Sequence, residues 1–112
     1  MDGFYVAYMT GRVGTSLLMI VISRGTIVGA DIGGINYDGT IEPKADGSGY
    51  KCSVVYVVQP GTALITGAPA PTEPQRIPVQ FDLPNNFADG QIITIETPLG
   101  PLNAKFQKIR GL

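Results

Sequence analysis

Turn-forming residues interrupt this chain so often that long regular elements have no room to form. The 112 residues include 15 glycines and 9 prolines, and no stretch between them carries the 3.6-residue period of an amphipathic helix. Short apolar runs rich in Val, Ile and Tyr recur instead, separated by turn signals about every 8–12 residues. We therefore expect one all-β domain over residues 1–112, a length that suits a single domain.

Eight or nine short strands fit the sequence. The expected strands span residues 4–9, 16–23, 26–30, 35–41, 50–59, 62–66, 77–83, 91–97 and 102–109. Successive hairpins leave little chain for long crossovers, which favours a meander-like barrel over a sandwich. Closure also removes the exposed strand edges of an open sheet. About eight strands enclose an interior that side chains fill or that holds one small ligand.

The connections between these strands have distinct characters. Arg24-Gly25 has the short spacing of a hairpin turn. Pro43 to Gly49 predicts an exposed hairpin loop, and Ala68 to Pro74 is too rich in proline for a ladder and predicts a stiff, extended surface loop. Pro78 lies inside a strand with one polar face, which indicates an edge strand or a bulge.

Charge and residue usage argue against several function classes. The net charge is −1, and no basic cluster carries interleaved aromatics, so we expect no nucleic-acid partner. Without histidine the chain lacks the commonest general base and metal ligand, so we expect no enzyme, no metal and no cofactor. The longest apolar run, Leu17 to Ile22, is far shorter than the roughly 20 residues of a membrane span. With no signal-peptide pattern at Met1 to Tyr5, we expect a cytoplasmic protein without membrane contact.

Two local features invite a chemical interpretation. The segment Asp31 to Gly39 combines carboxylates with glycines, but its spacing matches neither a calcium loop nor a phosphate loop. We interpret its glycines as turn residues and Asp31 as a cap for backbone N–H groups. Cys52 shares strand parity with Val54 and Tyr56 and lacks a histidine partner, which favours a buried structural thiol over a nucleophile.

The first 50 residues carry five of the nine aromatic side chains, namely Phe4, Tyr5, Tyr8, Tyr37 and Tyr50. A stacking platform for bases or sugars would need basic residues beside such rings. Because no cluster of basic residues accompanies them, we expect these side chains to pack in the core or to line a cavity.

The stretch Arg24 to Gly39, together with the opening Asp2-Gly3-Phe4-Tyr5, resembles the GrlR-like family. These small bacterial proteins are related to a negative regulator of type III secretion. They share an Asp-Gly-aromatic-Tyr opening and a Gly-x-Ile-x-Gly-Gly-Asp then Tyr-x-Gly signature, and Ala30 here replaces one glycine. The matching residues are Asp2, Gly3, Tyr5, Gly25, Gly29, Asp31, Tyr37 and Gly39.

The resemblance implies an eight-stranded, up-and-down, lipocalin-like barrel with an apolar cavity, mostly antiparallel, that forms a homodimer and regulates by binding a protein. It also implies that a surface loop holds the protein partner. The corresponding hairpin here is Glu42 to Gly47, where Glu42, Lys44 and Asp46 are the candidate partner residues. This hairpin lacks the acidic tetrad that the family's best-known member carries in its partner-binding loop.

Three functions follow as hypotheses. The favoured one is a non-catalytic regulatory or interaction module, and the alternative is an intracellular carrier of a small apolar ligand in the barrel cavity. An enzyme is the least favoured, because the inventory of catalytic side chains is so thin.

Self-association is expected because Leu17 to Ile22 and Val54 to Val58 are apolar on both alternating faces. A barrel strand needs only one apolar face, so the second must be covered. A second copy of the chain is the simplest cover. We therefore predict a homodimer whose interface includes Leu18, Ile20 and Ile22, or their alternates Leu17, Met19 and Val21.

Overall fold

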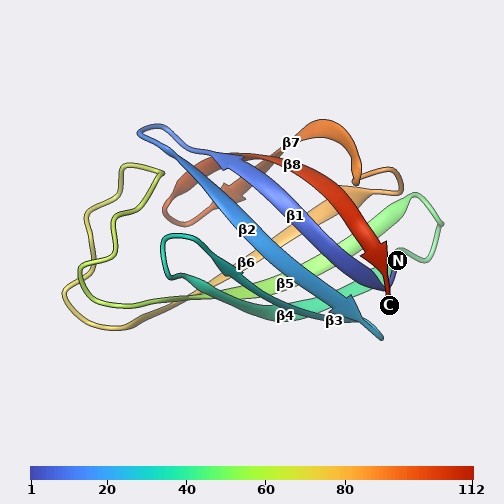
Figure 1. The fold of residues 1–112 in the computed structure, drawn as a ribbon, viewed down its shortest axis with the longest axis horizontal. Coiled ribbons are helices and arrows are strands. Elements are labelled where there is room, and N and C mark those ends of the chain that lie inside the picture. The colour runs from blue at the N-terminus through green and yellow to red at the C-terminus, as the bar shows by residue number, and fades with distance from the viewer.

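The computed structural model describes residues 1–112 and contains eight β-strands and no helix (Figure 1). The strands are β1 (Gly3–Thr10), β2 (Thr15–Ser23), β3 (Thr26–Asp31), β4 (Asn36–Pro43), β5 (Gly49–Val58), β6 (Gln75–Pro84), β7 (Asp89–Thr97) and β8 (Gly100–Gly111). The positions follow the alternation of apolar runs and turn signals in the sequence. No helix is long and apolar enough to cross a membrane.

The strands form one antiparallel sheet in the order β6-β5-β4-β3-β2-β1-β8-β7. Consecutive strands pair with each other, except β6 and β7, which form no ladder. The first and last strands, β1 and β8, also pair. The sheet curls into a nearly closed up-and-down barrel, as the sequence predicts (Figure 1). Pro78 lies in β6, at the edge of the sheet, where a missing N–H is tolerated.

The expected strand at residues 62–66 is wrong. These residues belong to the connection between β5 and β6, which leaves the barrel as a long loop over residues 59–74 (Figure 1). One backbone hydrogen bond, which the Val13 N–H donates to the Ile65 carbonyl at 2.9 Å, links this loop to the β1–β2 turn. Without a neighbouring strand no ladder forms, and Leu64 and Ile65 instead pack against the barrel core.

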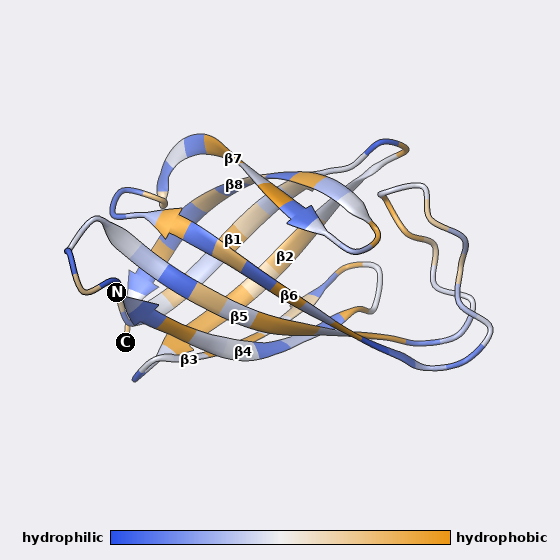
Figure 2. Ribbon diagram, turned by 180° about the vertical axis from the view of Figure 1, so that it is seen from behind, coloured by the Kyte–Doolittle hydropathy of each residue, from blue (hydrophilic) through white to orange (hydrophobic).

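Alternating side chains divide the barrel wall into an inner and an outer face. Figure 2 shows hydrophobic and hydrophilic residues alternating along β6, which has one face toward solvent. On β2 the inward set is Leu18, Ile20 and Ile22, all buried in the core cluster. The prediction that this set forms a dimer surface is therefore wrong.

The reason lies in the strand register. Both alternating sets of β2 are apolar, so the sequence of β2 does not indicate which set points inward. The pairing with β1 determines which set points inward, because Ile20 lies opposite Tyr5, whose ring is in the core. The alternates Leu17, Met19 and Val21 therefore take the outer face, where Met19 is 52% exposed.

Candidate functional site

The two ends of the barrel differ in how tightly side chains fill the interior. Both termini lie at one end of the barrel, which we call the plugged end (Figure 1). There the β6–β7 turn contributes Phe87, which is buried in the core cluster. Its ring centroid lies 5.6 Å from that of Tyr5, 5.8 Å from that of Tyr50 and 5.7 Å from that of Phe106. These rings fill the space, and the interior from the middle of the barrel to this end retains a free volume of only about 40 Å³.

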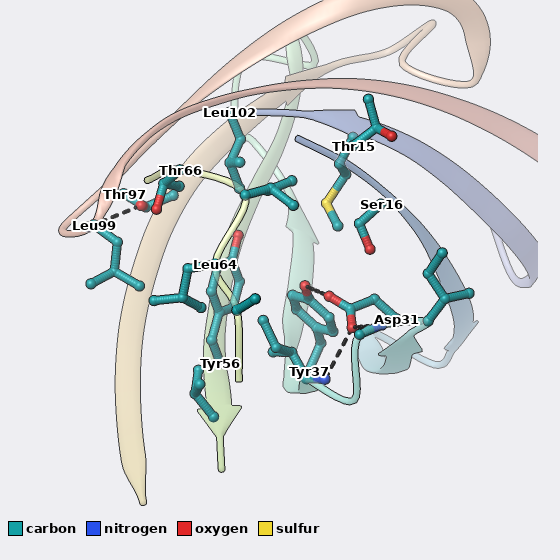
Figure 3. A pocket seen from close by; sticks show the side chains of 17 residues that line it. Thr15, Ser16, Asp31, Tyr37, Tyr56, Leu64, Thr66, Thr97, Leu99 and Leu102 are labelled. Atoms are coloured by element: carbon teal, nitrogen blue, oxygen red, sulfur yellow. Dashed lines mark hydrogen bonds between the residues drawn. The ribbon is translucent and has the colours of Figure 1, made fainter. Parts of the chain in front are cut away.

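The opposite end, which we call the open end, contains a pocket of about 300 Å³. The long loop at residues 59–74 reaches across it and contributes Leu64 and Thr66 to its wall (Figure 3). Tyr37, Tyr56 and Leu102 line it from the strands. This volume lies at the lower end of the range of small-molecule sites.

Asp31, at the end of β3, organises the polar side of the pocket. Its Oδ1 accepts hydrogen bonds from the backbone N–H groups of Gly33 at 2.9 Å and Ile35 at 3.0 Å. Its Oδ2 accepts one from the Tyr37 hydroxyl at 2.6 Å. The predicted capping role of Asp31 is thus confirmed, and the carboxylate also holds the Tyr37 side chain (Figure 3).

Tyr37 and Tyr56 form the floor of the pocket as an edge-to-face pair with centroids 4.7 Å apart. Burial, and secondly the hydrogen bond to Asp31, raise the pKa of Tyr37 well above its ordinary value. Burial, and secondly the charge of Asp31, raise the pKa of Tyr56 to about 12. Both hydroxyls therefore stay protonated at neutral pH and are poor general bases.

One polar atom beside the pocket has no partner. The Oγ atom of Ser16 is buried and forms no hydrogen bond, although Ser16 belongs to the pocket wall. Asp31 is the only charged residue in that wall, and no cation lines it. The site thus combines apolar walls, one carboxylate and one unpartnered hydroxyl.

Sequence reasoning did not identify Ser16, Leu64 or Thr66 as site residues. A signal existed for Ser16, since it shares the strand parity of the buried Leu18 and Ile20 and is thus a polar residue at an inward position. Leu64 and Thr66 had no comparable signal, because only the path of the loop brings them to the pocket.

The signature residues near the N-terminus meet at the plugged end. The Asp2 carboxylate accepts a hydrogen bond from the Arg24 N–H, at 3.2 and 3.3 Å from its two oxygens. Arg24 and Gly25 both have positive φ, 50° and 77°, as a two-residue I′ turn requires, and the predicted hairpin is confirmed. Tyr5 donates to the Met1 carbonyl, and the neighbouring Gly3 is buried.

The other signature glycines lie in the barrel wall, where strands approach closely. A Cβ at Gly29 would lie 2.7 Å from the Met19 carbonyl oxygen, and one at Gly39 would overlap the Ser53 carbonyl. Asp31 and Tyr37 complete the set as the bonded pair at the open end. The eight residues therefore divide between two distant ends and the wall, and do not form one site.

The hairpin proposed to hold a protein partner lies at the plugged end, away from the pocket (Figure 1). The Lys44 ammonium forms an ion pair with Asp82 at 2.9 Å. Asp46 accepts hydrogen bonds from the backbone and hydroxyl of Ser48, which lower its pKa, and Glu42 is exposed at the end of β4. Partner binding by this hairpin stays a prediction.

Cys52 is buried in the core, as predicted. Burial, and secondly the charge of Asp82, raise the pKa of its thiol to about 12. A thiol in this state is a poor nucleophile, because the thiolate is the reactive form. No group of three or more acidic, Cys or His side chains is arranged to hold a metal ion.

No protein-family model, no curated protein and no solved structure matches this chain. The resemblance to the GrlR-like family therefore stays a prediction from the residues, and the functional proposals depend on the geometry of the barrel.

Proposed function

We propose that this protein is a non-catalytic binding module that holds one small, mainly apolar molecule in the pocket at the open end of the barrel. The observation that carries the proposal is the contrast between about 300 Å³ of space at this end and about 40 Å³ in the rest of the interior. Barrels of eight strands are wide enough for one such guest.

The chemistry of the wall supports binding without turnover. The Tyr37 and Tyr56 hydroxyls are held protonated, and three hydrogen bonds fix the Asp31 carboxylate in place. No second carboxylate, lysine or cysteine lines the pocket to complete an acid–base or nucleophilic pair. An apolar wall with few fixed polar groups is typical of a ligand site.

Binding can be measured with N-phenyl-1-naphthylamine, a neutral dye whose fluorescence rises in apolar surroundings. We expect saturable enhancement by the wild-type protein and a loss of at least about tenfold in affinity for Leu64→Trp, which fills the pocket. The control is Ala70→Trp, an exposed position of the same loop. Equal affinities for Leu64→Trp, Ala70→Trp and wild type would place the dye elsewhere and contradict the proposal.

A second candidate function, self-association or protein binding, is favoured by the outer face of β1, β2 and β3. Two cross-strand rows there are apolar, Phe4-Val21-Val28 and Val6-Met19-Ala30. Phe4, Met19 and Val28 are exposed to 37%, 52% and 53%. A continuous apolar surface of this kind is usually covered by a partner, and the proposed regulatory role would use it.

The flanks of this face suit a second copy of the same chain. The first row continues to Arg110 on β8 at one side and to Asp38 on β4 at the other. A twofold axis parallel to β2 would place Arg110 of each copy against Asp38 of its partner, and Phe4 against Val28. In this arrangement the row faces its own copy, and the opposite charges at its two ends pair across the interface. This favours a symmetric dimer over association with an unrelated surface.

A further inference from the structure

We propose that the ligand of the open-end pocket is an amphiphile whose head donates hydrogen bonds and carries no negative charge, as an ammonium or hydroxyl group does. This inference rests on the proposed function. It assigns the head to Asp31 and Ser16 and the apolar body to the leucine side of the pocket.

The charge of the wall is the first reason. Asp31 is the only charged residue in the wall, and the one ion pair of the molecule, Lys44 with Asp82, involves neither the pocket nor Asp31. A carboxylate or phosphate head would bring a second negative charge to this half-buried group without a cation to compensate it. Anionic amphiphiles such as fatty acids are therefore disfavoured.

The unused hydrogen-bonding capacity is the second reason. An ionised carboxylate offers about four acceptor positions, and Asp31 uses three of them, for Gly33, Ile35 and Tyr37. The remaining position is open to one further donor. The buried Ser16 Oγ also lacks a partner, and buried polar atoms are rarely left unsatisfied in folded proteins. A ligand head with N–H or O–H groups supplies what both residues lack.

The arrangement of the wall gives the ligand a direction. Figure 3 shows Asp31, Ser16 and Tyr37 together on one side of the pocket, and Leu64 and Leu99 on the other beside Thr66 and Thr97, whose hydroxyls are already hydrogen-bonded within the chain. A head bound at Asp31 directs the apolar chain toward these leucines, where contact with water is lost. An apolar molecule without a head would leave the Ser16 hydroxyl unsatisfied.

Three ligands with the same eight-carbon chain test the inference: octylamine, 1-octanol and octanoate, each displacing N-phenyl-1-naphthylamine from the wild-type protein at pH 7. We expect octylamine and 1-octanol to compete at least about tenfold better than octanoate. Equal competition by all three, or a preference for octanoate, would overturn the head-group inference while leaving small-ligand binding intact. If the dye binds wild type and Leu64→Trp alike, the proposed function fails instead.

Two variants identify the residues responsible. Asp31→Asn keeps the size of the side chain and removes its charge, so the preference for octylamine over octanoate should fall to within about threefold, whereas Asp89→Asn at the plugged end should leave it unchanged. Should Asp31→Asn fail to fold, Ser16→Ala still tests the site. It removes an unpaired hydroxyl, so the fold should be retained while 1-octanol affinity falls about threefold or more. An unchanged preference in Asp31→Asn, or unchanged 1-octanol affinity in Ser16→Ala, contradicts the assignment.

Discussion

The plugged end and the open end of the barrel are built from the same strands and differ in what enters them. At the plugged end the β6–β7 turn is short and places Phe87 among Tyr5, Tyr50 and Phe106. At the open end the connection between β5 and β6 is a long loop that covers the strands without filling the space beneath. One barrel thus has a packed half that stabilises the fold and a hollow half that contains the proposed binding pocket.

The two ends of the barrel also differ in the polar side chains that line them. The packed half is lined by aliphatic and aromatic side chains and the Cys52 thiol, with no charged residue, whereas the open end contains Asp31 and Ser16. Burying a carboxylate is tolerated there because three donors compensate it. The aromatic packing and the pocket thus lie in separate regions, so mutations should affect stability and the proposed ligand binding to different extents.

The largest effect is expected on the labelling rate of the Cys52 thiol, which tests whether water and reagent enter the packed half. Because its thiol pKa rises from 9.0 to about 12, the native thiolate fraction at pH 8 should be roughly a thousandfold below that of the unfolded chain. Labelling with Ellman's reagent should be slower by a similar factor in native protein than in urea. Comparable rates in the two states would mean that the packed half admits water and reagent.

The same raised pKa sets a pH dependence of stability. Since the native thiol pKa lies above its ordinary value, its contribution to stability is intact below about pH 9 and is lost as the pH rises through about 12. Tyr56, with a pKa of about 12, adds to this loss. Urea unfolding midpoints should therefore fall steadily above pH 9 and be less pH-dependent there in Cys52→Ala.

The next largest effect is expected on the free energy of unfolding when the Phe87 ring is removed. Phe87→Ala deletes a buried ring that contacts three other aromatic rings, and we expect unfolding free energy to fall by about 3–5 kcal/mol in urea titrations. The matched control is Ile92→Ala on β7, where the side chain is 71% exposed and the change should stay within about 0.5 kcal/mol. A loss below about 1 kcal/mol for Phe87→Ala would show that the two ends do not differ in this way.

A smaller loss is expected at the open end. Asp31→Ala removes the acceptor of three hydrogen bonds, which we expect to lower the unfolding free energy by about 1–3 kcal/mol. Asp89→Ala, at an exposed position of β7, serves as the control. If both substitutions had equal effects, the network around Asp31 would contribute nothing to the fold.

The smallest effect on stability is expected on the outer face. Met19→Lys should change the unfolding free energy of the barrel by no more than about 0.5 kcal/mol yet abolish self-association, because it places a charge in the middle of the apolar rows. Light scattering at micromolar concentration should give about twice 11.8 kDa for wild type and for the control Thr40→Lys, and close to 11.8 kDa for Met19→Lys. A wild-type mass near 11.8 kDa would rule out self-association through this face.

The strand content was predictable from the sequence because turn signals separate nearly every pair of strands. Residues 62–66 were the exception, since Thr62 to Thr66 has strand composition but no neighbouring strand with which to pair. Local composition cannot supply that partner. The same limit applies to β2, whose inward set became clear only from the pairing of Ile20 with Tyr5.

The candidate site was less predictable than the fold. Asp31 was recognised as a backbone cap from its Gly-rich context, and that prediction is confirmed. The pocket was not predictable, because its volume depends on where the 59–74 loop lies and on the absence of a plugging ring like Phe87 at that end. Such features arise from packing between segments far apart in the sequence.

The most direct test of ligand binding at the open end is an NMR titration of the isotope-labelled wild-type protein with 1-octanol. We predict saturable amide shifts at Asp31 to Tyr37 and at Ala63 to Thr66, with none at Tyr5, Phe87 or Phe106. Saturable shifts centred on the plugged end, or no saturable shifts at any concentration below the solubility limit of 1-octanol, would contradict the assignment of binding to the hollow half of the barrel.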